Sequence, residues 1–317
     1  MNFNIIQIFF TNLFKINKIK LEKNNPYNNK NINKKNNLLL KIRKNKIITD
    51  LYKEYLIKFI LTLISKNANF DFTIFKKNIK SLNIVITNRE NEIWTAQYDN
   101  KKNIIYIQEE QLNLGLLEDN LYHELFHMLT SRNKHQIEYI GFQKNGVFGK
   151  GINEGYTQVL CKRYFNLETG GYQVEEIISR SLEYIVSKSL MENFYSKAKF
   201  NELISEIAKY NNDINETYRL LSDIDILLKL NPLLYQDTII SIHEFIRRLK
   251  ITLIEIIELF INKKVIDKNN DDIEEFFKNI SFGIRTPSGD YRVFEKEEIE
   301  KYKNHCYQIT KQKEHYF

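Results

Sequence analysis

The stretch that decides the fold is residues 121–129, LYHELFHML. It places a His-Glu-x-x-His pattern inside an otherwise uncharged run that is typical of a buried helix. Residues four apart lie on the same face of a helix, so His123 and His127 point in the same direction. Two such imidazoles can bind one zinc ion, with Glu124 beside them as a base towards a water molecule on the metal. An ordinary amphipathic helix with two hydrogen-bonded histidines is the alternative, and the cost of burying these groups without partners disfavours it.

The third ligand is sought downstream, because catalytic zinc sites usually take three protein ligands and keep a fourth position for water. A histidine six positions after the second ligand is excluded, since Asn133 stands there. His135 lies in a polar run that is typical of a solvated loop, and Glu154 is therefore the better candidate. Asn153 can cap a new helix that runs to about Phe165, with Glu154 in its first turn. A first-turn glutamate that only favours the helix dipole remains the alternative.

These two motifs, His123-Glu124-x-x-His127 and residues 153–157 (NEGYT), resemble the gluzincin group of metallopeptidases, and uncharacterised bacterial members most closely. The resemblance extends over residues 84–165. It implies that His123, His127 and Glu154 bind one Zn²⁺ per chain and that Glu124 is the catalytic glutamate. The chain departs from the pattern at Gln158, where such helices often carry a carboxylate that orients a zinc-bound histidine. An amide can still accept a hydrogen bond from an imidazole N–H.

A small sheet is expected before the histidine helix. Residues 82–87, 92–98 and 104–107 are rich in β-branched and aromatic residues, which indicates strands, and the helix is expected to begin near Leu117 to Asn120. An extended peptide can add to the exposed edge of such a sheet by main-chain hydrogen bonding.

After residue 170 the pattern is almost wholly helical, consistent with only three prolines and ten glycines in the chain. Helices are predicted at residues 174–191, 200–210, 213–230, 238–262, 271–279 and 295–313, with a loop at 281–290. We therefore predict an α+β protein in three parts: a basic, partly disordered Asn/Lys-rich segment at residues 1–48, a small zincin-like sheet-plus-helix catalytic domain at 49–170, and a mainly α-helical subdomain at 171–317.

Peptide hydrolysis also needs a group besides the metal that stabilises the developing oxyanion, usually a Tyr, His or Arg. Tyr156 is the first candidate for this catalytic role because it is close to Glu154 in sequence. Tyr172, His243 and Tyr291 are further candidates. The chain has 19 tyrosines, so most of them must serve packing or the surface.

The net charge of +7 is compatible with nucleic acid, membrane or acidic partners. Lysines gather early, at residues 15–46, around the low-complexity run at residues 24–37, which predicts a solvated linker rather than a nucleic-acid arm. The apolar run at residues 5–14 has no preceding basic residues and is too short to span a bilayer. Cys161 and Cys306 give no disulfide framework. We expect a cytoplasmic protein without a membrane span.

The function predicted on these grounds is a zinc metallopeptidase that hydrolyses peptides or proteins. One alternative is a non-catalytic or regulatory zinc protein. Glu124 disfavours a purely structural site, because such sites usually close with four protein ligands. The other alternative is a basic helical binding protein in which the His-Glu-x-x-His pattern is accidental.

Overall fold

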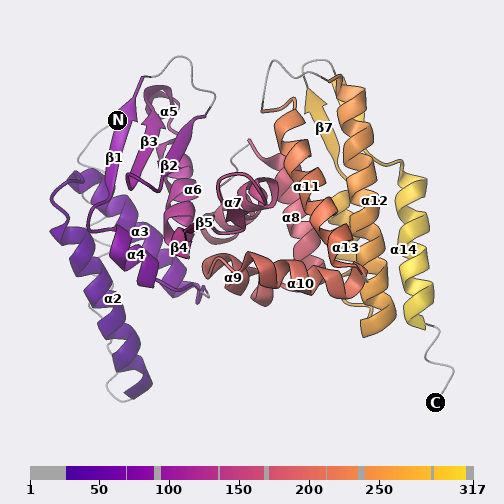
Figure 1. Ribbon diagram of the computed structural model, residues 1–317, viewed down its shortest axis with the longest axis horizontal. Coiled ribbons are helices and arrows are strands. Elements are labelled where there is room, and N and C mark those ends of the chain that lie inside the picture. Colours follow the sequence, from indigo (N-terminus) through magenta and orange to yellow (C-terminus); the bar gives the residue numbers. More distant parts are fainter. Residues whose placement is uncertain are drawn as a thin grey trace.

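Helices build most of the chain, and three small sheets complete an α+β fold (Figure 1). The computed structural model describes residues 26–68, 70–88, 94–134, 136–167, 171–211, 213–234, 240–286 and 289–311. The apolar run at residues 5–14 and His135 lie outside these ranges. The predicted fold class is confirmed.

The sheet before the histidine helix has three strands in the order β1-β3-β2. The strands are β1 (Asn83–Thr87), β2 (Ala96–Asp99) and β3 (Ile104–Gln108). β1 runs parallel to β3 and β2 antiparallel to it, so β2 is an edge strand. The first and third predicted strands are confirmed, whereas the second begins at Ala96, and residues 92–93 of its predicted range lie outside the described residues.

Helix α6 (Leu117–Thr130) follows the short α5 (Glu109–Asn113), where the sequence predicted a helix. It packs against β2 and β3 on one side and against α4 (Thr73–Asn78) and α7 (Lys150–Phe165) on others. This enclosure buries every residue from Leu121 to Thr130. Aromatic rings fill the space around it, with Phe126 in edge-to-face contact with Phe59 of α3 (Asp50–Ser65).

The N-terminal segment differs from the prediction. Residues that were expected to form a solvated linker belong to helix α2 (Pro26–Lys44). Leu38 and Ile42 of this helix are buried in the main core. These two apolar positions follow the low-complexity run and are four residues apart, so they place one face of the helix against the core.

The polar run after α6 is also not a loop. It forms β4 (Arg132–Lys134), which pairs with β5 (Ile137–Ile140), and β5 pairs with β6 (Gln143–Lys144). These strands lead the chain into α7, which Figure 1 shows between the sheet-bearing part and the C-terminal helices. Helix α7 contacts both sides, because it packs on α6 and also on α8 (Gln173–Val186) and α11 (Ile214–Leu230).

The C-terminal half is helical, as predicted, with one predicted helix divided in two. Ser187 has a φ of 89° and ends α8, so residues 174–191 are not one helix. The predicted loop at 281–290 carries the strands β7 and β8, which form a hairpin. The elements are α8 (Gln173–Val186), α9 (Lys188–Ser196), α10 (Phe200–Asn211), α11 (Ile214–Leu230), α12 (Ile242–Asp267), α13 (Ile273–Ile280), β7 (Gly283–Thr286), β8 (Gly289–Arg292) and α14 (Lys296–Lys311).

Buried apolar side chains of the sheet-bearing part and of the C-terminal helices form one continuous cluster. Within the described ranges, no helix is both long enough and apolar enough to cross a membrane.

Candidate metal centre

Helix α6 presents two histidines to α7. His123 and His127 are four residues apart, and their ring centroids lie 4.8 Å from each other. Both side chains are buried. The local cause is helical spacing, and the enclosure of α6 keeps the two rings out of bulk water.

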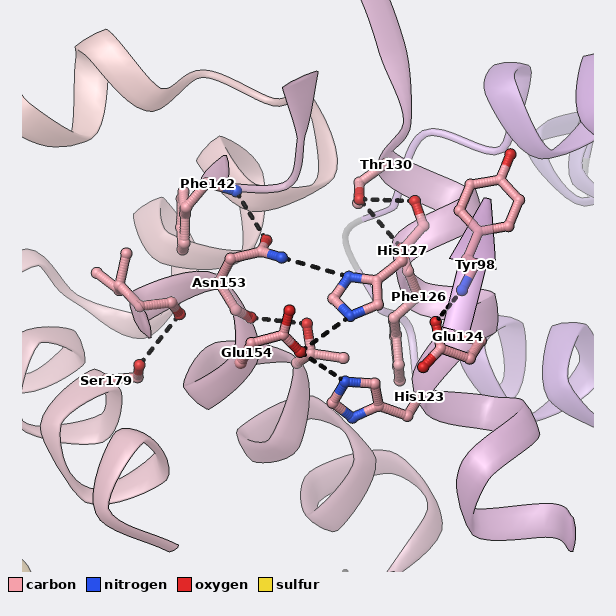
Figure 2. A network of polar contacts seen from close by, with 12 residues as sticks. Tyr98, His123, Glu124, Phe126, His127, Thr130, Phe142, Asn153, Glu154 and Ser179 are labelled. Carbon is pink, nitrogen blue, oxygen red and sulfur yellow. Dashed lines mark hydrogen bonds and ion pairs between the residues drawn. The ribbon is translucent and has the colours of Figure 1, made fainter. Parts of the chain in front are cut away.

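Glu154 of α7 completes the group; because α7 begins at Lys150, Glu154 lies in the second turn of the helix and not in the predicted first turn. Its Oε2 lies 3.0 Å from Nε2 of His123 and 3.3 Å from Nε2 of His127 (Figure 2). One ligand atom from each of the three residues can be chosen so that all lie within 4.8 Å of one another. The structure thus brings together the three residues that the sequence singled out as metal ligands, from two helices that pack side by side.

The donor set fits zinc. Two imidazole nitrogens and one carboxylate oxygen are the ligands of catalytic zinc sites that leave a position for water. Burial by itself would raise the pKa of Glu154, but His127 and His123 hold this pKa well below its usual range. The carboxyl group is therefore ionised and supplies the negative charge that a buried cation needs.

Asn153 has a different role from the predicted one. Gly149 precedes α7 at the cap position, so Asn153 is not the N-cap. Its Oδ1 accepts from the backbone N–H of Phe142 at 3.0 Å, and its Nδ2 lies 3.3 Å from Nδ1 of His127 (Figure 2). Because the N–H of Phe142 can only donate, the amide group presents its NH₂ to Nδ1 of His127.

Glu124 points towards the sheet. Its Oε2 accepts a hydrogen bond of 2.7 Å from the backbone N–H of Tyr98 in β2 (Figure 2). Burial raises the pKa of Glu124 to about 7, and the charge of Glu154 adds to this effect against the opposing influence of His123. A carboxyl group with a pKa near neutrality can both accept and donate a proton, which suits acid–base catalysis.

Tyr156 does not reach the centre, which corrects the prediction of a catalytic role. Its side chain is fully buried, and its hydroxyl donates to Glu183 of α8 at 2.9 Å. Its ring packs against Phe142 and Tyr195. Two positions along a helix turn a side chain by about 200°, so a residue two after Glu154 faces away from His123 and His127.

Of the other three candidates, Tyr172 contacts one of the predicted ligands. Its ring stacks on that of His123, with centroids 5.5 Å apart and an interplanar angle of 21°. His243 instead lies edge-to-face against Tyr291, at a centroid distance of 5.5 Å. Tyr291 lines an open cavity of about 850 Å³, whose wall also includes Gln173, the residue next to Tyr172.

Gln158 does not orient a histidine. The side chain is 1% exposed, and neither its Oε1 nor its Nε2 has a hydrogen-bond partner among the described residues. Asn153 instead contacts Nδ1 of His127. Sequence reasoning missed this contact, although Asn153 stands directly before the ligand. It also missed Tyr98, whose backbone N–H carries no signal in the sequence.

Comparison with protein-family models, with characterised proteins and with solved structures found no match to this chain.

Proposed function

We propose that this protein is a single-zinc metallopeptidase. The observation that carries the proposal is the buried convergence of His123, His127 and Glu154, with Glu124 next to the first histidine. Their ligand atoms come from two helices, and three protein ligands are the number that a catalytic zinc site takes, whereas structural sites usually take four.

His123, His127 and Glu154 would hold the zinc ion. When bound, the ion supplies Lewis-acid chemistry that polarises a water molecule and the carbonyl of the scissile bond. Glu124 accepts the proton of the attacking water and delivers it to the leaving amine. The hydrogen bond from the Tyr98 N–H keeps the Glu124 carboxylate in one orientation.

The edge strand β2 supports a peptide substrate. The backbone N–H of Gln108 donates to the carbonyl of Thr95, which marks the bonded positions of the β2–β3 pair. The alternation of an antiparallel ladder then turns the main-chain groups of Ala96 and Tyr98 away from β3. The outward N–H of Tyr98 already meets Glu124, so a peptide that pairs with this edge lies beside the general base.

Tyr172 replaces Tyr156 as our candidate for stabilising the oxyanion, because its ring contacts a ligand. We expect Tyr172→Phe to retain zinc and to lower kcat about tenfold to a hundredfold if its hydroxyl serves the transition state. An unchanged kcat would exclude this role.

The metal and the chemistry are tested separately. Zinc content is measured for the wild type, His123→Ala and Glu154→Ala, with His243→Ala as the matched control, since His243 contacts Tyr291 rather than the ligands. We expect one zinc per chain in the wild type and in the control, and little or none in the two ligand variants.

Peptide hydrolysis is then measured with a peptide library, with Glu124→Gln as the test variant. We expect this variant to keep its zinc and to lose activity about a hundredfold or more. No zinc in the reconstituted wild type would overturn the proposal. Bound zinc without hydrolysis of any peptide would support a regulatory zinc protein instead.

A further inference from the structure

The start of the metal-ligating helix α7 is held by a residue of the C-terminal half. The backbone N–H groups of Gly149 and Gly151 donate to Oδ2 and Oδ1 of Asp225, both at 2.7 Å. Asp225 belongs to α11 and is 7% exposed. The first amide groups of a helix have no partners within the helix, so a buried helix start requires acceptors from elsewhere. One carboxylate here satisfies two of them.

The same helix start is in close contact with backbone on two sides. Gly149 has a φ of +77°, and a Cβ on it would lie 2.3 Å from the carbonyl oxygen of Phe142. A Cβ on Gly151 would lie 2.7 Å from the carbonyl oxygen of Ile224, the residue before Asp225. Helix α7 therefore begins directly against α11, at a separation that only glycine permits.

Glu154 follows Gly151 by less than one helical turn, which is about 4.5 Å along the axis. A shift of the helix start is therefore transmitted to the ligand almost undiminished. Metal ligands tolerate little displacement, because the residues of a site must be held within about 0.5 Å of their productive positions.

We propose that Asp225 is a positioning residue for the metal centre: by fixing the first turn of α7 against α11, it sets where Glu154 stands relative to His123 and His127. This inference rests on the proposed zinc site. It makes α11 a component of the centre, although α11 contributes no ligand.

The test compares zinc affinity with stability. Asp225→Asn removes one of the two carboxylate acceptors, and Asp225→Ser removes both. Asp213→Ala is the matched control. Asp213 caps α11 itself by accepting from the N–H of Asn215 at 2.8 Å, and it is exposed. Zinc dissociation constants are measured by chelator competition, site geometry by the visible spectrum of the Co²⁺-substituted protein, and folding by circular dichroism and urea unfolding.

We expect both Asp225 variants to bind zinc about tenfold or more weakly and to show an altered Co²⁺ spectrum. The Asp213 variant should lose some stability and keep the wild-type affinity and spectrum. Asp225 variants that lose stability but keep wild-type affinity and spectrum would overturn the inference and leave Asp225 as a plain helix cap.

A measurement on the wild type covers the case in which the variants do not fold. If the start of α7 and the metal site are coupled, zinc binding must in turn stabilise the helix start. We expect zinc to slow hydrogen exchange at the amides of Gly149 and Gly151, and unchanged exchange would overturn the inference. A wild type that binds no zinc would overturn both proposals, whereas one that binds zinc without these effects would overturn this one alone.

Discussion

Glu175 of α8 gives a prediction whose size follows from the structure. Its backbone lies against Gly155 of α7, and its carboxyl oxygens accept from Nδ2 of Asn231 at 3.0 and 3.3 Å. Burial raises the pKa of Glu175 from its ordinary value of 4.5 to about 7, although the hydrogen bond from Asn231 opposes this rise. The folded protein therefore holds a proton on this group at pH values where the unfolded chain has released it.

The sign of the effect on stability follows from the two pKa values. Below pH 4.5 the carboxyl group is protonated in both states and does not affect the free energy of unfolding. As pH rises from 4.5 to about 7, only the unfolded state ionises, so stability falls. Above pH 7 the loss is constant, and the difference between the pKa values corresponds to about 3 kcal/mol at roughly 1.36 kcal/mol per pH unit.

We predict that Glu175→Gln raises the free energy of unfolding by about 3 kcal/mol at pH 8 and leaves it nearly unchanged at pH 4. Glutamine cannot ionise, and its oxygen still accepts from Asn231. Urea unfolding at the two pH values measures the effect. Glu176→Gln is the control, because that carboxylate pairs with Arg180 and Lys162 near the surface and should lose at most about 1 kcal/mol. Equal stability of wild type and Glu175→Gln at pH 8, or an equal gain at both pH values, would refute the reasoning.

Three further predictions concern helix α7. Asn153→Asp should tighten zinc binding about tenfold. A carboxylate can accept from both the Phe142 N–H and a protonated Nδ1 of His127, whereas the amide presents NH₂ to that nitrogen. Chelator competition measures the zinc affinity. Gln158→Met should raise the free energy of unfolding, measured in urea, by about 1–2 kcal/mol, since it removes a buried amide that has no partner among the residues the structure describes. Gly155→Ala should lower it by about 1–3 kcal/mol or more and weaken zinc binding, because the new Cβ would lie 2.0 Å from the carbonyl oxygen of Glu175.

Each of these has an outcome that would count against it. Weaker zinc binding by Asn153→Asp would contradict the assigned direction of the amide group. A less stable Gln158→Met would mean that the amide has a partner in solution. Wild-type stability and affinity in Gly155→Ala would show that α7 and α8 separate without cost.

The sequence alone singled out the three residues that converge at the candidate metal centre, because the features that mark them are local. His123 and His127 share a face through helical spacing, which any four-residue separation on a helix produces. Glu154 was singled out from its expected place in the first turn of a new helix, although α7 begins at Lys150 and places this residue in the second turn. The two strands and most of the C-terminal helices were also correctly predicted, because their periodic patterns extend over several residues.

Tertiary structure decided which side chains surround these ligands. The partner of Asn153, the unpaired amide of Gln158 and the stacking of Tyr172 on His123 all depend on how α6, α7 and α8 meet. The hydrogen bonds from Gly149 and Gly151 to Asp225 join residues that are far apart in the chain. Helical periodicity states which face a residue occupies, but only packing determines what that face meets, because contacts between helices depend on the loops and core side chains of the whole chain.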